Sequence, residues 1–159
     1  MTGKTAKDQG GPNQQGSNHQ GLRLMAEDAA DLKVMSAALQ DAVATREHFT
    51  YEPTKRRFSA ELNRFRWEVD KPRGRIHQRV RTAFALEGVL SVRARGLAAG
   101  AAGDVLQVLS LEWVPDTEPP GGQIAILLAG GGEIRVMVEC VDAMLIDMSA
   151  PWPTRHKPD

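Results

Sequence analysis

The stretch LLAGGGEIRVMVE, residues 127–139, decides between a phosphate-binding loop and a β-hairpin. A phosphate-binding loop opens onto a helix and carries a lysine or hydroxyl residue after its glycines, and neither follows here. Instead, apolar residues alternate on both sides of the glycines, at Ile124, Ile126 and Leu128 before them and at Ile134, Val136 and Val138 after them. Glycine supplies the positive φ that a hairpin turn needs. The stretch therefore predicts two antiparallel strands that turn over residues 129–133.

A second hairpin is predicted upstream, in HFTYEPTKRRFSAELNRFRWEV, residues 48–69, with its turn at residues 53–55. Apolar residues in its second arm change parity, because Phe58, Ala60 and Leu62 alternate on one face whereas Phe65, Trp67 and Val69 fall on the other. A β-bulge near Asn63 and Arg64 would bring all six to the core. We expect this bulge at a bend of the sheet; the alternative is a polar pair directed at a site.

Three further segments carry strand patterns. Residues 75–96 and 104–113 alternate, and the second is predicted to be a central strand, with one face formed by Val105, Leu109, Leu111 and Trp113. Residues 140–148 fit a strand or a helix by spacing alone. The segments RVRTAFALEGVLSV, residues 79–92, and IRVMVECVDAMLID, residues 134–147, share a weak internal similarity that favours the strand and suggests two related β units.

One helix is predicted near the start of the ordered chain. A short strand at residues 22–25 precedes Asp28, which can cap a helix whose buried face carries Leu32, Met35, Leu39 and Val43. Many strands with one helix predict an α+β fold, in which a mainly antiparallel β sandwich or partly open barrel carries one N-terminal helix.

Composition sets the domain organisation. Residues 1–20 lack large apolar side chains beyond Met1 and are predicted to form a disordered tail, followed by a single globular domain at 21–152 and a C-terminal tail at 153–159. The tripeptide GKT at residues 3–5 lacks the upstream strand and glycine of a nucleotide-binding loop. No segment matches a membrane span or the apolar core of a signal peptide. The one cysteine, Cys140, excludes an internal disulfide and is expected to be a buried thiol, which favours a cytoplasmic protein.

Catalytic motifs are sparse, and no cofactor or metal site is indicated. The four histidines lack the short spacings of metal ligands, and no nucleophile elbow is present. Carboxylates of the C-terminal half could assemble an acid–base site, so a small enzyme remains the alternative; the candidates are Glu112, Glu133, Glu139, Asp142 and Asp147.

Charge is distributed unevenly along a chain whose formal net charge is zero. Residues 55–95 hold 12 basic and 4 acidic residues, a net of +8, whereas residues 96–159 hold 3 basic and 9 acidic residues, a net of −6. Such asymmetry indicates either an anionic partner or internal pairing between the two halves.

The basic residues alternate in RIHQRVR, residues 75–81, and again at Arg93 and Arg95 on what is expected to be the neighbouring strand. We therefore predict a basic sheet face that binds an anion, formed by Arg75, His77, Arg79, Arg81, Arg93 and Arg95. The expected function is that of a non-catalytic binding or adaptor protein, whose partner is RNA, a phosphorylated ligand or an acidic protein. The oligomeric state stays open.

Three stretches resemble a known family of uncharacterised bacterial proteins, the domain of unknown function 2948. They are LRLMAEDAADLKVMSAALQDAV (residues 22–43), LNRFRWE (residues 62–68) and AGGGEIRVMVECVDAMLIDMSAPW (residues 129–152). The resemblance covers nearly all of residues 22–152 and implies a cytoplasmic protein of alphaproteobacterial type. It implies no activity and no catalytic residues.

Overall fold

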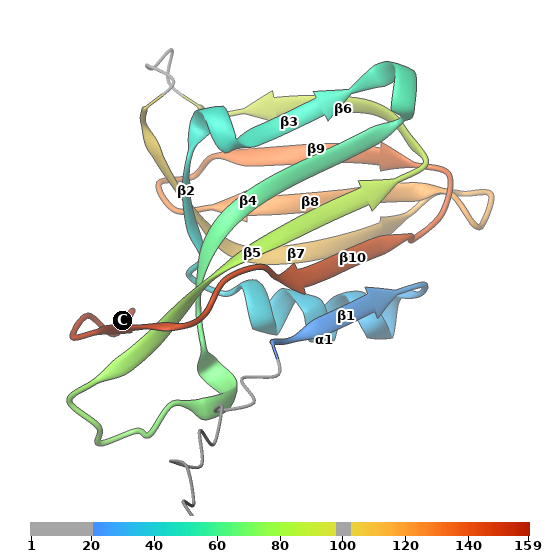
Figure 1. Ribbon diagram of the computed structural model, residues 1–159. Helices are drawn as coiled ribbons and strands as arrows, with labels where there is room; N and C mark the ends of the chain where they lie inside the picture. The colour runs from blue at the N-terminus through green and yellow to red at the C-terminus, as the bar shows by residue number, and fades with distance from the viewer. Residues whose placement is uncertain (1–20, 98–102) are drawn as a thin grey trace, which may run out of the picture.

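The computed structural model describes residues 21–97 and 103–159, so the predicted disordered tail lies outside the described residues. A mostly antiparallel sheet of eleven strands carries one α-helix, which confirms the predicted fold class (Figure 1). The elements follow in the order β1 (Arg23–Ala26), α1 (Ala29–Leu39), β2 (Val43–Thr45), η1 (Arg46–His48), β3 (Phe49–Glu52), η2 (Pro53–Lys55), β4 (Arg57–Phe65), η3 (Trp67–Val69), β5 (His77–Glu87), β6 (Val89–Arg95), β7 (Val105–Pro115), β8 (Gly122–Leu128), β9 (Glu133–Val138), β10 (Ala143–Asp147) and β11 (Trp152–Thr154).

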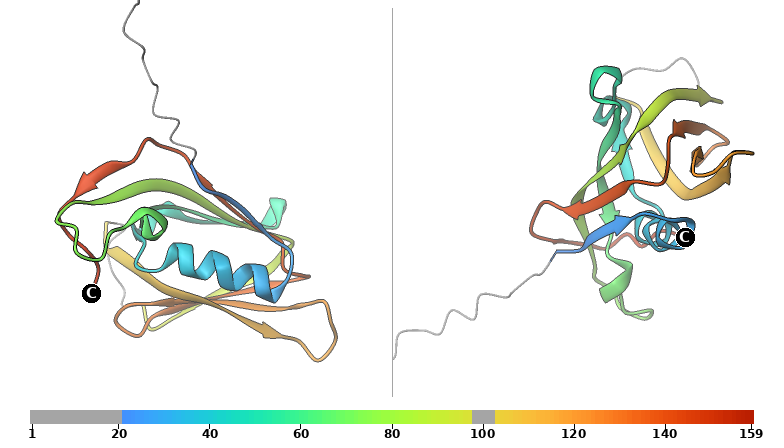
Figure 2. Two further views of the ribbon diagram at one scale, coloured as in Figure 1. Left: turned by 90° about the horizontal axis from the view of Figure 1, so that it is seen from below. Right: turned by 90° about the vertical axis from the view of Figure 1, so that its right-hand side faces the viewer.

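The strands form two layers around one core. Their order is β1-β10-β5-β4-β2-β7-β8-β9-β6, with β3 paired to β4 and β11 paired to β5. Figure 2 shows a front layer, which we define as β1, β3, β4, β5, β10 and β11, facing a rear layer of β6, β7, β8 and β9. The short strand β2 joins the layers by pairing with both β4 and β7. The result is a strongly bent sheet in which outward side chains of the two layers point in opposite directions.

Helix α1 covers the open side between the layers, where it packs against β1 and β7. Asp28 is its N-cap, since its carboxylate accepts a hydrogen bond from the Asp31 amide at 2.8 Å. Leu32, Met35 and Leu39 are buried as predicted. Val43 lies in β2 instead, because the helix ends at Leu39.

The predicted bulge in β4 is absent. Strand β4 pairs with β5 in one continuous register from Arg57 to Phe65, so the alternation continues through Asn63 and places Arg64 inward. Arg64 is 0% exposed. Phe65 points to the outer face, where Trp67 packs against its ring at a centroid distance of 4.4 Å. The change of apolar parity therefore marks a second, smaller apolar cluster outside the layer.

The structure places a bulge in β7 instead. The register between β7 and β8 shifts between Val108 and Ser110. As a consequence Val105 and Leu109 are 67% and 44% exposed, whereas Val108 and Leu111 are buried. The expected face of Val105, Leu109, Leu111 and Trp113 is therefore wrong, because a bulge reverses parity. The strand is central as predicted, since it pairs with β2 and β8.

Both predicted hairpins are confirmed. Strands β3 and β4 turn at η2, and strands β8 and β9 turn over residues 129–132. Gly130 and Gly131 adopt φ values of 86° and 90°. The Leu128 amide donates to the Gly132 carbonyl at 2.8 Å, which closes the turn. These glycines thus allow the hairpin turn, and because a strand and not a helix follows them, they do not form a phosphate-binding loop.

The two segments that share the internal similarity lie side by side. One runs from β5 through Gly88 into β6, and the other runs from β9 through residues 139–142 into β10; β5 pairs with β10 and β6 with β9. Residues 143–147 form a strand, as preferred from the sequence. Cys140 lies at this corner and is exposed, which corrects the expected buried thiol, because the chain turns here between the layers.

Candidate functional site

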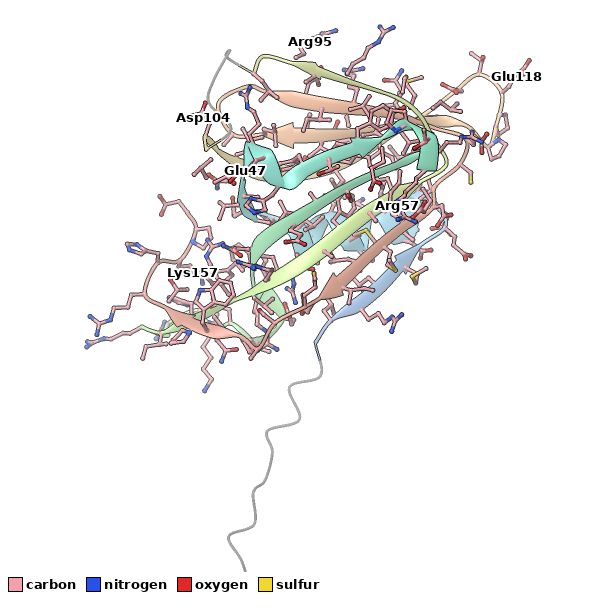
Figure 3. The ribbon with its side chains drawn as sticks, turned by 45° about the horizontal axis from the view of Figure 1, so that its top comes forward. Glu47, Arg57, Arg95, Asp104, Glu118 and Lys157 are labelled. Carbon is pink, nitrogen blue, oxygen red and sulfur yellow. The ribbon has the colours of Figure 1, made fainter. Side chains whose placement is uncertain are left out.

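The structure separates the six basic residues into three places. Figure 3 shows Arg95 at the upper edge, on β6, far from the arm at the lower left that ends near Lys157. We define the arm as residues 70–77 together with β11 and residues 155–157. Arg75 lies on the arm, His77, Arg79 and Arg81 lie along β5, and Arg93 and Arg95 lie on β6. Strand β6 pairs with β9 and not with β5, so the expected single basic face is wrong.

His77 is buried, with 5% of its side chain exposed, and its Nδ1 lies 2.5 Å from the Asp70 carboxylate. The ammonium group of Lys157 lies 2.8 Å from the same carboxylate. Hydrogen bonds from Lys157 and His77 lower the pKa of Asp70. The predicted contact of His77 with a surface anion is therefore corrected, because Asp70 and the ring of Phe65 cover it.

Arg79 is half-buried and packs against the small apolar cluster of Phe65 and Trp67. Its guanidinium lies 5.7 Å from the centroid of the Phe65 ring and donates to the Asn63 carbonyl at 3.1 Å. Burial lowers the pKa of Arg79, and the charge of Asp41 offsets this effect in part. The residue therefore ties β5 to β4, whereas Arg75 and Arg81 are exposed and have no carboxylate at ion-pair distance in the part of the chain described.

The remaining two residues line a hollow on the outer face of the rear layer. In the register of β6 and β9, Arg93 lies directly opposite Arg135, and Arg95 lies opposite Glu133. The hollow has a volume of about 440 Å³. Its lining is Ser91, Arg93, Ala94, Arg95, Gln123, Glu133, Arg135 and Met137.

The charges in this hollow are unbalanced, with three arginines and one glutamate. Glu133 binds Arg135 at 3.0 Å and reaches Arg95 only at 3.8 Å. The Nη1 group of Arg135 also donates to the side-chain oxygen of Gln123 at 3.3 Å. Among the described residues, no carboxylate lies at ion-pair distance from Arg93. The arrangement can therefore accept an anionic group between Arg93 and Arg135.

The sequence does not predict Arg135 as a site residue, because it lies in the acidic half of the chain, which holds only three basic residues. Its alternation with Glu133 and Met137 indicates an outward position on a strand. Nothing local in the sequence indicates that this strand pairs with residues 89–95, so the juxtaposition with Arg93 required the tertiary structure.

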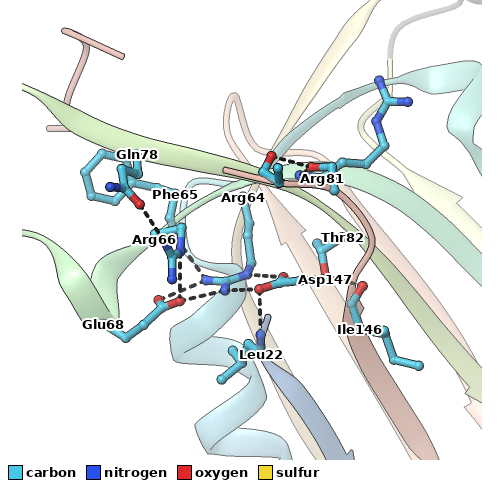
Figure 4. Close-up of polar contacts among 12 residues, drawn as sticks. Leu22, Arg64, Phe65, Arg66, Glu68, Gln78, Arg81, Thr82, Ile146 and Asp147 are labelled. Atoms are coloured by element: carbon cyan, nitrogen blue, oxygen red, sulfur yellow. Dashed lines mark hydrogen bonds and ion pairs between the residues drawn. The ribbon is translucent and has the colours of Figure 1, made fainter. Parts of the chain in front are cut away.

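A second, denser charge cluster is buried and internally satisfied (Figure 4). Arg64 Nη2 lies 2.7 Å from both Asp147 and Glu68, and the Leu22 amide donates to Asp147 at 2.8 Å. Burial lowers the pKa of Arg64, but hydrogen bonds with Asp147 and Glu68 outweigh this effect and raise it overall. The same contacts overcome the effect of burial on both carboxyls, so the pKa values of Asp147 and Glu68 are lowered. This cluster joins β4, η3 and β10 to Leu22, which directly precedes β1.

Internal pairing accounts for only part of the charge asymmetry. Four ion pairs join the basic segment to the acidic half within the described residues: Arg56 with Glu139, Arg64 with Asp147, Arg95 with Glu133, and, with the charges reversed, Asp70 with Lys157. Six of the 12 basic residues in segment 55–95 have no ion pair within the described residues, namely Lys71, Arg73, Arg75, Arg79, Arg81 and Arg93. Internal pairing therefore applies to part of the basic segment, and an anionic partner for the rest stays a prediction.

The carboxylates of the alternative enzyme site are distributed over separate elements. Asp147 is bound to Arg64, Glu133 to Arg135, and Glu139 to Arg56. Glu112 lies on β7, and Asp142 lies in the turn before β10. Over residues 21–97 and 103–159, no group of three or more histidine, cysteine, aspartate or glutamate side chains is arranged to hold a metal ion.

The comparisons with known proteins give one match. A family model with the description Protein of unknown function (DUF2948) matches residues 22–159. No curated protein and no solved structure matches the chain. Across the described residues, no helix has the length and apolar character to cross a membrane.

Proposed function

We propose that this chain, which belongs to the family of Protein of unknown function (DUF2948), is a non-catalytic binding protein for a phosphorylated small ligand. The observation that carries the proposal is the direct opposition of Arg93 and Arg135 in the hollow of the rear layer. We place the protein in the bacterial cytoplasm, which fits a chain that forms no internal disulfide.

The opposed arginines favour an anion on electrostatic grounds. Like charges directly opposite on neighbouring strands are destabilising, and an anion between Arg93 and Arg135 removes that repulsion. Guanidinium groups bind phosphate oxygens in pairs of parallel hydrogen bonds. A phosphate group between the two arginines would therefore give Arg93 a charge-assisted bond that it does not make within the described chain, and would share Arg135 with Glu133.

The dimensions and lining favour a small molecule over a polymer. A volume of about 440 Å³ falls in the range of small-ligand pockets, roughly 300 to 1,000 Å³. Met137 and Ala94 supply apolar surface beside the arginines, and Gln123 supplies an amide. We therefore expect the ligand to combine a phosphate group with an apolar part.

The test is calorimetric titration of the full chain with inorganic phosphate, a nucleoside monophosphate and a single-stranded oligouridylate. Arg93→Gln should weaken the nucleoside monophosphate about 10- to 100-fold, since a charge-assisted hydrogen bond contributes roughly 1.5 to 3 kcal/mol. The matched control is Arg75→Gln, which removes an exposed arginine from the arm and should leave the affinity unchanged.

Two results would overturn the proposal. One is equal weakening by Arg93→Gln and Arg75→Gln, which would mean that general positive charge and not the hollow attracts the probe. The other is binding of the oligouridylate alone, with a salt slope of about −3 in log affinity against log salt, as expected for a polymer that engages about four phosphates. That slope would assign the function to RNA binding.

A further inference from the structure

The arm carries positive charge that the described chain does not neutralise. It holds one acidic residue, Asp70, and five basic residues, a net of +4, and Asp159 beyond it lowers the net charge of this region to +3. Asp70 is already bound to His77 and Lys157. Within the described residues, no carboxylate lies at ion-pair distance from the other four basic residues, namely Lys71, Arg73, Arg75 and Arg155.

The tip of the arm, which we define as residues 71–76, is built on a β-turn. The Gly74 amide donates to the Lys71 carbonyl at 2.8 Å, and Pro72 occupies the second position of the turn, where its fixed φ is favourable. The tip contains no carboxylate and no aromatic ring. Its exposed residues are Lys71, Pro72, Arg73, Arg75 and Ile76.

Tertiary contacts hold the arm in place. Figure 1 shows the start of β5 and the segment before it projecting beyond both layers, with the C-terminal segment alongside. Trp152 and Thr154 lie on β11, which pairs with the start of β5. The Asp70 carboxylate joins the two sides of the arm, because His77 begins β5 and Lys157 follows β11. An arm fixed in this way costs less to order when a partner binds.

A projecting segment with unpaired cations is complementary to a polyanion, and the tip favours duplex DNA among polyanions. Single-stranded nucleic acid is bound by stacking its bases on aromatic side chains, which the tip lacks. Binding to an anionic membrane also requires buried apolar area, and Ile76 is the one large aliphatic side chain of the tip. Duplex DNA requires neither feature, since cations that contact its phosphates supply most of the affinity.

The minor groove of DNA matches the tip in width and in chemistry. It is about 6 Å wide, so it admits a narrow segment such as a single turn, and its negative potential attracts arginine side chains. Proline and isoleucine are among the residues that wedge between base steps from this groove, and Pro72 and Ile76 are exposed. Arg155 lies beside Ile76, where it can reach a flanking phosphate.

We propose that the arm binds duplex DNA with its tip in the minor groove. Arg73 and Arg75 enter the groove, and Lys71 and Arg155 contact phosphates on either side of it. The inference goes beyond the proposed function, because the hollow that contains Arg93 lies on β6 and β9, away from the arm (Figure 3). A ligand in the hollow and DNA on the arm therefore use different residues.

The test is fluorescence anisotropy of a labelled A·T-rich duplex titrated with the full chain over a salt series. Four cations that neutralise about four phosphates give a slope of roughly −4 in log affinity against log salt. The double variant Arg73→Gln with Arg75→Gln should weaken binding about 10-fold or more and make the slope shallower by about 2. The matched control, Arg23→Gln with Arg93→Gln, removes the same charge from exposed positions on β1 and β6 and should keep the affinity.

Two further measurements locate the tip on the duplex. A dye that occupies the minor groove should compete with the chain, and a G·C duplex should bind more weakly, because A-tracts have a narrower and more negative minor groove. Circular dichroism verifies that each variant is folded. The nucleoside monophosphate affinity should fall in Arg93→Gln and stay unchanged in the arm variant, so this inference and the proposed function can fail separately.

Four results would overturn the inference. The first is a wild-type chain that binds no duplex at low salt, including one that binds only vesicles of phosphatidylglycerol. The second is tighter binding of the single-stranded oligouridylate than of the duplex. The third is equal weakening by the arm variant and its matched control, which would assign the binding to general positive charge. The fourth is binding that the minor-groove dye does not reduce.

Discussion

Removing the negative charge of Asp147 tests whether the buried cluster of Figure 4 stabilises the fold. The side chains of Arg64 and Asp147 are 0% and 1% exposed, and that of Glu68 is 36% exposed. In Asp147→Asn the amide oxygen still accepts from the Leu22 amide, but Arg64 keeps Glu68 as its one carboxylate partner among the described residues. The variant therefore removes one buried negative charge together with the hydrogen bond that Asp147 Oδ1 accepts from Arg64 Nε at 2.8 Å.

The expected cost follows from the burial of Arg64. Removing one partner of a buried ion pair costs about 3 to 5 kcal/mol, because the other charge stays buried without compensation. Glu68 compensates Arg64 in part, so we expect a loss of about 3 kcal/mol for Asp147→Asn. Glu68→Gln, at the more exposed end of the cluster, should cost about 1 kcal/mol. The double variant Arg64→Met with Asp147→Asn should recover most of the loss, since no buried charge remains.

Urea unfolding followed by circular dichroism measures these differences, and its pH dependence gives a second readout. The pKa values of Asp147 and Glu68 are lowered in the folded chain. Their stabilisation is therefore complete above the unfolded values of about 4 and is lost as the pH falls through the folded values. The double variant should lose less stability than the wild type over this acid range.

The reasoning fails if Asp147→Asn lowers the free energy of unfolding by less than about 1 kcal/mol at neutral pH, because a buried charge that loses its partner destabilises the fold by more than that. A double variant that is less stable than Asp147→Asn would also contradict it. That result would mean that Arg64 stabilises the chain through its packing and not through its charge.

Three further outcomes are expected. Gly131→Val should lower the melting temperature, because valine is strained at a φ of 90°, whereas Gly103→Val, at a glycine with open space and no positive φ, should not. Arg79→Gln should lower the free energy of unfolding by about 2 kcal/mol through loss of its carbonyl and Phe65 contacts, and equal stability of Arg79→Gln and Arg75→Gln would contradict this role. Cys140 should react with a thiol reagent in the native chain at the rate of an exposed thiol, and protection until unfolding would show that it is covered.

The sequence was sufficient for features that depend on near neighbours along the chain. Alternation around Gly130 and Gly131 predicts the β8–β9 hairpin, because a strand's two faces repeat every two residues. The spacing of Leu32, Met35 and Leu39 behind the cap at Asp28 predicts helix α1 for the corresponding reason. Together these patterns predicted the fold class.

The candidate site was predicted only in part. Arg93 and Arg95 share β6 as the sequence indicates, but β6 does not neighbour β5, and the residue opposite Arg93 is Arg135, 42 positions further along the chain. Alternation predicts which face of the sheet a side chain occupies, but it does not predict which strand pairs with the strand that carries it. His77 shows the same limit, because its outward position on β5 is covered by Asp70 and Phe65.

The sequence by itself thus determined the helix, the two hairpins and most of the strands, but not the position of the bulge, since the former depend on backbone preferences and on periodicity over a few residues. The tertiary structure alone decided which charges are paired and which remain for a ligand. Arg64 and Arg93 are both arginines at strand positions, yet Asp147 neutralises the first from 83 residues away while the second faces another arginine. The physical reason is that ion pairing depends on separation in space, which the order of strands in the sheet sets and which no local pattern encodes.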